Sequence, residues 1–321
     1  MNGEQSKIEI LAPFGAAYEW MKAMLFRPFD VAKWLTIGFA AFLAGSWGGG
    51  LNFGRIGRLG GGDWKYRVTS DGNLPGDWNV PAWAIALVVA GVVVVVILAF
   101  VLMWVAARGR FIFTDCVVKN RGAIVEPWRE FRREGNSFFL FSLVVALAMI
   151  LLTAILILMI VGALKLSSHH EGPFVVVILG LIVLGLVWLA VTLFFALVTQ
   201  FMVPVMYRRR CSAREAFLDA SRLMLRNPGP FILFVLFGIV LLLAVGIVGA
   251  MISCLTCCIG GLPYISTVLL LPAIVWLAAF KLLFLRQFGE QYDVWAAVGF
   301  PQVQPAVAQP PGPSLPPPSS A

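Results

Sequence analysis

Charge is the property that this sequence has least of. Only 12% of its 321 residues are Asp, Glu, Lys or Arg, whereas 60% are hydrophobic. The mean hydropathy is +0.90, well above the value of an ordinary soluble domain. A soluble core cannot bury so large an apolar fraction, so the composition excludes a soluble globular protein and predicts an integral membrane protein.

Acidic residues are missing from six long apolar runs. The runs are residues 31–47, 82–107, 138–164, 174–206, 230–252 and 262–285. A bilayer core about 30 Å thick needs about 20 helical residues, because backbone polar groups inside it must bond within their own segment. The runs therefore predict an all-α fold, a polytopic transmembrane helix bundle of about six spans. Since ion-coupled transporters usually need an ionisable group at mid-membrane depth, this absence weighs against that class.

Histidine is almost absent, and the two that occur, His169 and His170, are adjacent in one short connection. No acid lies within the apolar runs, and their two bases, Lys33 and Lys281, lie toward the cytoplasmic ends, so the sequence contains no catalytic constellation and we expect no enzyme activity. The Gly-rich residues 48–62 lack the Lys-Ser/Thr pair of a phosphate-binding loop. We therefore expect no cofactor.

Cysteine occurs five times. Cys254, Cys257 and Cys258 stand together at the expected outer end of the fifth run, but no fourth ligand or thioredoxin-like context accompanies them, so we predict no metal site. A disulfide on the outer side and thiols packed among apolar side chains both remain open. Cys116 and Cys211 fall on the opposite, cytoplasmic side and should be reduced.

Basic residues are plentiful only on alternate connections. The N-terminal stretch, residues 108–137 and 207–229 and the end of the sixth run hold 19 Lys and Arg, against five on the other side. The positive-inside rule then predicts a multi-pass protein with both termini in the cytoplasm. No signal peptide precedes the first run, and we place the protein in a bacterial plasma (inner) membrane. The net charge of +8 fits anionic headgroups, and we expect no nucleic-acid binding.

These features divide the chain into three parts. Residues 1–30 form a cytoplasmic segment with an interfacial helix, and residues 31–293 form the six-span membrane domain, which includes a Gly-rich outer loop at 48–81. Residues 294–321 form a Pro-rich cytoplasmic tail, which we expect to be disordered.

One plan recurs three times along the chain, starting near residues 13, 125 and 213: an amphipathic segment, a break and an aromatic-led apolar run. In the third copy, one helical face carries Ala213, Ala216, Phe217, Ala220, Leu223 and Met224. The plan predicts three units, each an interfacial helix followed by a transmembrane hairpin. Either a true duplication or the shared demands of the interface would produce it.

Arginines beside these segments are the candidate contacts with anionic headgroups or a partner. They are Arg27, Arg132, Arg133, Arg208, Arg209, Arg210 and Arg226. The alternative is that they only set the topology and extend toward the membrane surface.

Several short motifs resemble an uncharacterised family of bacterial six-span membrane proteins. They are Arg27-Pro28-Phe29, Arg108-Gly109-Arg110-Phe111, Pro127-Trp128, Cys257-Cys258, Leu262-Pro263-Tyr264-Ile265, Leu271-Pro272 and Arg286-Gln287-Phe288-Gly289. That family is similar to the membrane domain attached to some glycerophosphoryl diester phosphodiesterases. The resemblance covers most of residues 13–293 and implies no catalytic residues, and we find no soluble phosphodiesterase domain in the chain.

The sequence thus predicts a lipid-associated accessory or scaffold that acts through interfacial helices and partner contacts. The expected partners are membrane lipids, chiefly anionic headgroups, and a membrane protein. The alternative is a passive transporter of a lipid-like or small amphipathic substrate.

Overall fold

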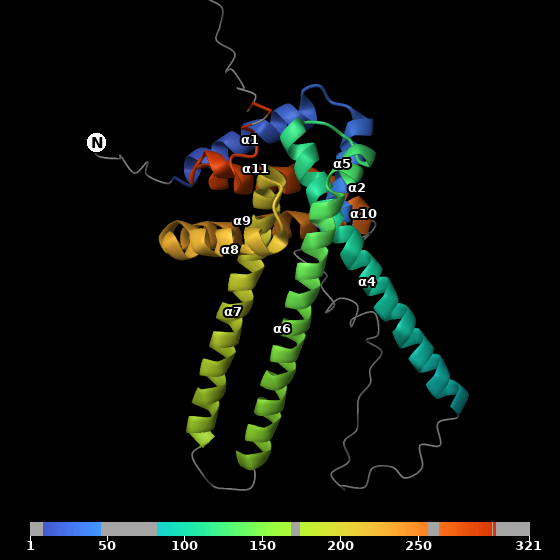
Figure 1. Cartoon of the computed structure of the whole chain (residues 1–321), viewed down its shortest axis with the longest axis vertical. Helices are drawn as coiled ribbons and strands as arrows, with labels where there is room; N and C mark the ends of the chain where they lie inside the picture. Colours follow the sequence, from blue (N-terminus) through green and yellow to red (C-terminus); the bar gives the residue numbers. More distant parts are fainter. Residues whose placement is uncertain (1–8, 46–81, 168–173, 256–262, 297, 300–321) are drawn as a thin grey trace, which may run out of the picture.

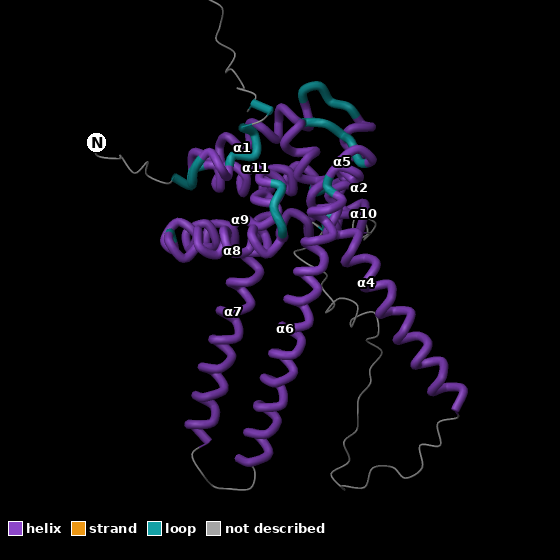
Figure 2. The backbone as a smooth tube through the Cα atoms, in the orientation of Figure 1, coloured by secondary structure: helices purple, strands orange, loops and turns teal. Residues whose placement is uncertain are grey.

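The computed structural model describes residues 9–45, 82–167, 174–255, 263–296 and 298–299, and these residues form helices and turns without a strand (Figure 2). The helices are α1 (Leu11–Phe26), α2 (Val31–Leu43), α4 (Ala82–Lys119), α5 (Val125–Glu130), α6 (Arg132–Ser167), α7 (Phe174–Arg209), α8 (Ala213–Arg226), α9 (Pro228–Leu255), α10 (Pro263–Leu269) and α11 (Leu271–Arg286), followed by the 3-10 turn η2 (Glu290–Tyr292). The predicted all-α class is confirmed for this part of the chain.

The molecule has two regions (Figure 1). Helices α1, α2, α5, α8, α10 and α11 gather at one end with the adjoining turns of α4, α6 and α7, and we call this region the head. From the head, α4, α6 and α7 extend as long helices, and α4 diverges from the other two. Helix α9 runs antiparallel to α11, because Phe231 faces Phe288 at one end (5.2 Å between ring centroids) whereas Gly249 lies beside Leu270 at the other.

The head contains the well-packed core. Among its largest fully buried side chains are Trp20, Phe111, Phe280, Phe284 and Trp295. Burying one such side chain contributes roughly 1.5–3 kcal/mol. The buried Trp20 indole also donates a hydrogen bond to the carbonyl oxygen of Val117 at 3.1 Å, which satisfies its polar atom.

Four described helices are long and apolar enough to cross a membrane, namely Ile85–Lys119, Arg132–Gly162, Ile178–Arg209 and Pro228–Ile252. The most apolar stretches of the first two contain no buried residue, and those of the other two are only 6% buried. Val88 on α4 and Leu158 on α6 are 67% and 73% exposed. Because exposing apolar surface to water costs about 25 cal/mol per Å², these faces require lipid or protein around them.

The first predicted span forms only the 13-residue α2. At 1.5 Å per residue such a helix measures about 20 Å, short of the roughly 30 Å of a bilayer core. The helix ends before Gly45, whose φ of +70° turns the chain away. Its last residue, Leu43, lies against Gly109, so α2 runs beside the head portion of α4.

The sixth predicted span is divided at Leu270 into the seven-residue α10 and the 16-residue α11. Pro272 in the first turn of α11 lacks the N–H that a continuous helix would use. The six predicted spans therefore correspond to four helices of membrane length in the described residues.

The amphipathic pattern of residues 213–226 is confirmed as a helix with one buried face, but protein covers that face. The fully packed residues are Ala213, Ala216, Ala220 and Met224. The helix begins with a capping box, in which the backbone N–H groups of Glu215 and Ser212 each donate to the other residue's side chain. Phe217 stacks on Phe195 of α7 (5.8 Å) and contacts Phe141 of α6 (5.1 Å).

Helix α1 is covered in the same way, by α11. The Phe14 ring lies 4.5 Å from Trp276 and 5.7 Å from Phe280. By contrast, the amphipathic segment of the second unit is the six-residue α5. The three-unit plan therefore has unequal members here, and duplication stays a prediction.

The two ends of the described chain meet in the head. The Glu9 N–H donates to Gln287 Oε1, and Gln287 Nε2 donates to the Glu9 carbonyl, both at 2.8 Å. Val294 and Trp295 are 2% and 1% exposed, so the folded head extends past residue 293, where we placed the start of the tail. Residues 300–321, the Gly-rich loop and both histidines lie outside the described residues.

Candidate functional site

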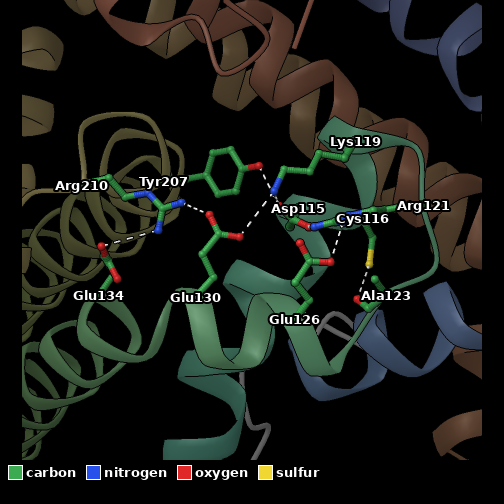
Figure 3. A network of polar contacts seen from close by, with 10 residues as sticks. All are labelled: Asp115, Cys116, Lys119, Arg121, Ala123, Glu126, Glu130, Glu134, Tyr207 and Arg210. Carbon is green, nitrogen blue, oxygen red and sulfur yellow. Dashed lines mark hydrogen bonds and ion pairs between the residues drawn. The ribbon is translucent and has the colours of Figure 1, made fainter. Parts of the chain in front are cut away.

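The main polar site of the head is a network of charged side chains that joins α4, α5, α6 and α7 (Figure 3). Its centre is Asp115 on α4, whose side chain is 0% exposed. The Tyr207 hydroxyl donates to Asp115 Oδ1 at 2.9 Å, and Lys119 Nζ reaches the same oxygen at 2.7 Å. Arg121 Nη2 donates to Asp115 Oδ2 at 3.0 Å. A buried carboxylate is tolerated only when it is paired and hydrogen-bonded, and both Asp115 oxygens meet this condition.

Local backbone structure brings these partners to Asp115. Lys119 lies four residues further along α4 and therefore on the same helical face. Asn120 then has a φ of +52°, a left-handed conformation that Asn adopts more readily than most residues. The turn lets Arg121 point back to Asp115. Asn120 also accepts a hydrogen bond from Lys33 Nζ at 2.8 Å, which ties α2 to the network.

The network continues outward to the acids of α5. Arg121 Nη1 donates to Glu126 Oε2 at 2.7 Å, and Lys119 Nζ lies 3.5 Å from Glu130 Oε2. Burial alone would lower the pKa of the Arg121 guanidinium, but the hydrogen bonds and charges of Glu126 and Asp115 outweigh burial and raise it. Arg121 therefore stays fully charged and holds the chain between α4 and α5.

Arg210 closes the network at the end of α7. It pairs with Glu130, and its Nη1 lies 3.7 Å from Glu134 Oε1 at the start of α6. Its guanidinium carbon lies 3.9 Å from the Phe131 ring centroid, and Phe131 stacks on Tyr207 at 4.9 Å. One cation thus contacts two acids and an aromatic face, and this fixes the end of α7 against α5 and α6.

This arrangement is suited to holding helices together. The central carboxylate has no exposed atom with which to reach a substrate, and its partners are all side chains of the same chain. Among the described residues, His, Cys, Asp and Glu form no group that could hold a metal ion. Cys116, next to Asp115, is fully buried and donates to the Ala123 carbonyl at 3.3 Å.

Residues 10–301 match a family of unknown function, DUF7544. The chain belongs to this family. The matched region includes every described helix and the whole network. No curated protein and no solved structure matches the chain. The predicted likeness to the membrane domain of glycerophosphoryl diester phosphodiesterases forms no part of this match and stays a prediction.

The predicted arginines of this family member fall into two groups. Two have internal partners, because Arg209 pairs with Asp219 of α8 and Arg210 belongs to the network. The others make no ion pair with the residues that the structure describes; they are Arg27, Arg132, Arg133, Arg208 and Arg226. Arg208 is half-buried and the remaining four are exposed. The structure thus leaves five of the seven predicted arginines for outside ligands.

The cysteine prediction is only partly within reach of the structure. Cys254 is a free, exposed residue in the last turn of α9, and Cys257 and Cys258 lie outside the described residues. A disulfide among them stays a prediction. On the head, burial raises the pKa of the half-buried Cys211 thiol, and the charge of Arg209 opposes this only in part.

Sequence reasoning missed Asp115 and Tyr207, the centre of the network. Residues 108–137 were predicted to be a connection between two spans, whereas α4 continues past residue 108 and ends at Lys119. A usable signal was present in the spacing of Asp115 and Lys119, which predicts an i, i+4 ion pair. Nothing in the sequence indicates that Tyr207 pairs with them.

Proposed function

We propose that the chain is an accessory or scaffold protein of a bacterial plasma membrane, anchored by its long apolar helices with the head at the cytoplasmic face. The observation that carries the proposal is the contrast between a closed head and uncovered apolar helices. Faces such as that around Leu158, 73% exposed, suit a partner helix or lipid. A carrier would pack these helices around a pathway, whereas α4 diverges from α6 and α7 (Figure 1).

The charge distribution supports the proposed orientation. The basic segments 108–137 and 207–229 lie at the head, beside α1 and the end of α11 (Figure 1). By the positive-inside rule the head then faces the cytoplasm, and both termini lie there. Both termini are assigned to this side because Glu9 and Gln287, near the two ends of the described chain, are hydrogen-bonded to each other in the head.

An accessory role also agrees with the resemblance to membrane domains that accompany a soluble phosphodiesterase. In this proposal the protein holds a partner at the membrane and carries out no reaction itself. The contacts with the partner are made by the uncovered faces of the long helices.

The proposal is tested by photo-crosslinking in intact membranes, followed by extraction in native lipid particles and mass spectrometry. A photoreactive residue replaces Leu158 on α6, and the control replaces Leu225 on α8, which is exposed to a similar degree (71%) but lies in the head. We expect one stoichiometric protein adduct from position 158. Adducts from position 225 alone would overturn the proposed contact surface. Selective flux of a solute or lipid through vesicles containing the purified protein would overturn the scaffold function.

A further inference from the structure

Arg108 lies at the border between the apolar part of α4 and the head. The predicted apolar run of α4 ends at residue 107, and that of α6 begins at residue 138. The Arg108 side chain is nevertheless buried, with the residue 7% exposed. Its guanidinium carbon lies 4.3 Å from the Trp104 ring and 5.1 Å from the Trp128 ring. Tryptophan is enriched at this depth in membrane proteins, where the headgroups begin.

The hydrogen bonds of Arg108 converge on one neutral atom. Its Nε and Nη2 donate to Asn136 Oδ1 at 3.2 and 2.8 Å, and Trp104 Nε1 donates to the same oxygen at 3.2 Å. Close approach of α6 makes this possible, since a Cβ at Gly135 would lie 2.9 Å from the Arg108 Cγ. The amide nitrogen of Asn136 donates to no described residue and is left for another acceptor.

Arg108 therefore carries an unbalanced charge. No described carboxylate pairs with it, although the neighbouring network supplies Asp115 with two cations. Arg132, at the start of α6, lies close enough for its positive charge to repel that of Arg108. Arg132 is exposed and also lacks an ion pair within the described part of the chain. Burying a charge without a counterion is costly, so this pair of cations favours an anion from outside.

We propose that Arg108, Arg132 and Asn136 bind the phosphate of an anionic phospholipid from the surrounding leaflet. Guanidinium groups suit phosphate oxygens, and basic sites between membrane helices are where anionic headgroups bind. Toward the N-terminus of α4, away from the head, α4 diverges from α6 (Figure 1). Leu102 on α4 and Leu140 on α6 are 47% and 62% exposed, which leaves apolar surface for the acyl chains. This inference rests on the membrane location proposed above, but it does not need a protein partner.

The test uses the purified full-length protein in phosphatidylcholine nanodiscs that contain a small fraction of phosphatidylglycerol. Native mass spectrometry measures how much phosphatidylglycerol stays bound when the disc is removed. We expect enrichment over phosphatidylcholine for the wild type, and a loss of about tenfold for Arg132→Gln. Arg222→Gln on α8 is the control, because Arg222 is likewise exposed but lies on a different helix from the site, and it should retain the wild-type level.

A second variant separates the site from a failure to fold. Asn136→Asp places a carboxylate beside Arg108 at nearly unchanged size, so it should abolish phosphatidylglycerol retention while raising the melting temperature in phosphatidylcholine alone. Wild-type retention in Asn136→Asp, equal losses in Arg132→Gln and Arg222→Gln, or no enrichment in the wild type would each overturn the proposal.

A third arm distinguishes a lipid from a soluble anion. Inorganic phosphate is added to the wild type in pure phosphatidylcholine discs, and stabilisation equal to that by phosphatidylglycerol would show that a soluble anion, not a lipid, is the ligand. The two proposals also fail separately. If no crosslinked partner is found, the scaffold function is overturned and the lipid site stands. If the wild type shows no lipid enrichment, the lipid site is overturned and the scaffold function stands. Failure of the protein to insert into discs would overturn both.

Discussion

Two glycines show how the head differs from the long helices. At Gly109 a Cβ atom would lie 2.5 Å from the backbone carbon of Leu43, so α2 and α4 touch through their main chains. At Gly180 on α7 a Cβ would meet nothing within 4 Å. The same residue type therefore permits close packing in one region and faces open space in the other. Small residues in a membrane protein indicate helix contact only where a second helix is present.

The polar groups of the two regions differ in the same way. On α6 and α7, Thr153 and Thr199 donate to backbone carbonyls four residues earlier, at 2.7 and 2.8 Å. Among the described residues, one side-chain hydrogen bond joins the two helices, from Trp188 Nε1 to Thr153 Oγ1 at 3.3 Å. In the head, Asp115 bonds with Tyr207, 92 residues away. In the long helices, polar side chains thus bond mainly to groups nearby in their own helix. In the head, they join residues that are far apart in the chain.

The largest expected effect is the loss of the head's central acid. Asp115→Ala leaves Lys119, Arg121 and the Tyr207 hydroxyl without their shared acceptor, so we expect it to destabilise the head by about 3 kcal/mol. Thermal unfolding in detergent measures the change. Asp219→Ala, which breaks the more exposed pair with Arg209, is the control and should cost under about 1 kcal/mol. Equal effects would show that the network does not differ from an ordinary surface ion pair.

The glycine comparison predicts a somewhat smaller effect. Gly109→Ala forces α2 away from α4, and such overpacking costs about 1–3 kcal/mol. Gly180→Ala, the same change on α7, should be neutral or slightly stabilising, because Ala has the higher helix propensity. Both are measured by the same unfolding assay. A loss of stability for Gly180→Ala would mean that α7 contacts another helix at that position, and would weaken the contrast between the two regions.

The start of α8 should contribute about 1 kcal/mol. Ser212→Ala removes the side chain that accepts the Glu215 N–H, and the loss of an N-cap has about this cost. Ser212→Asp keeps an acceptor there and should restore the stability. Hydrogen exchange of the first turn of α8 reports the change directly. If Ala and Asp behave alike, the packing of α8 on α7 alone fixes the helix.

The smallest effect is on thiol chemistry. Because burial raises the Cys211 pKa, less thiolate is present at pH 7, and a maleimide should modify Cys211 more slowly than it modifies the unfolded chain. The rate should rise about tenfold per pH unit below that pKa. Cys116, fully buried, should not react before the head unfolds. Single-cysteine variants separate the two, and rapid labelling of Cys116 would show that the head opens.

The sequence predicted the four long apolar helices because their cause is local. Runs 82–107, 138–164, 174–206 and 230–252 each lie within one observed helix. The short α2 was not predicted, since its end depends on the left-handed Gly45, and an isolated Gly does not reveal its φ. The partner of each amphipathic face was also undetermined. The pattern of residues 213–226 fits lipid and protein equally, and only the contact with Phe195 and Phe141 decides for protein.

The candidate site was less predictable than the fold. Predicted contacts Arg209 and Arg210 have partners on other helices, and these pairings depend on how α7 meets α5, α6 and α8. The sequence likewise did not single out Arg108, because its importance depends on the lack of a carboxylate partner among the described residues and not on a motif.

The contact between α1 and α11 sets an order for the protein's assembly. Trp276 Nε1 donates to the carbonyl of Phe14 across 262 residues of chain. At about 5–20 residues per second, α1 must wait for tens of seconds during translation before its covering helix exists. During that interval its apolar face is available to the bilayer surface or to a chaperone. The long helices can therefore enter the membrane first, and the head closes only after the last helix has been synthesised.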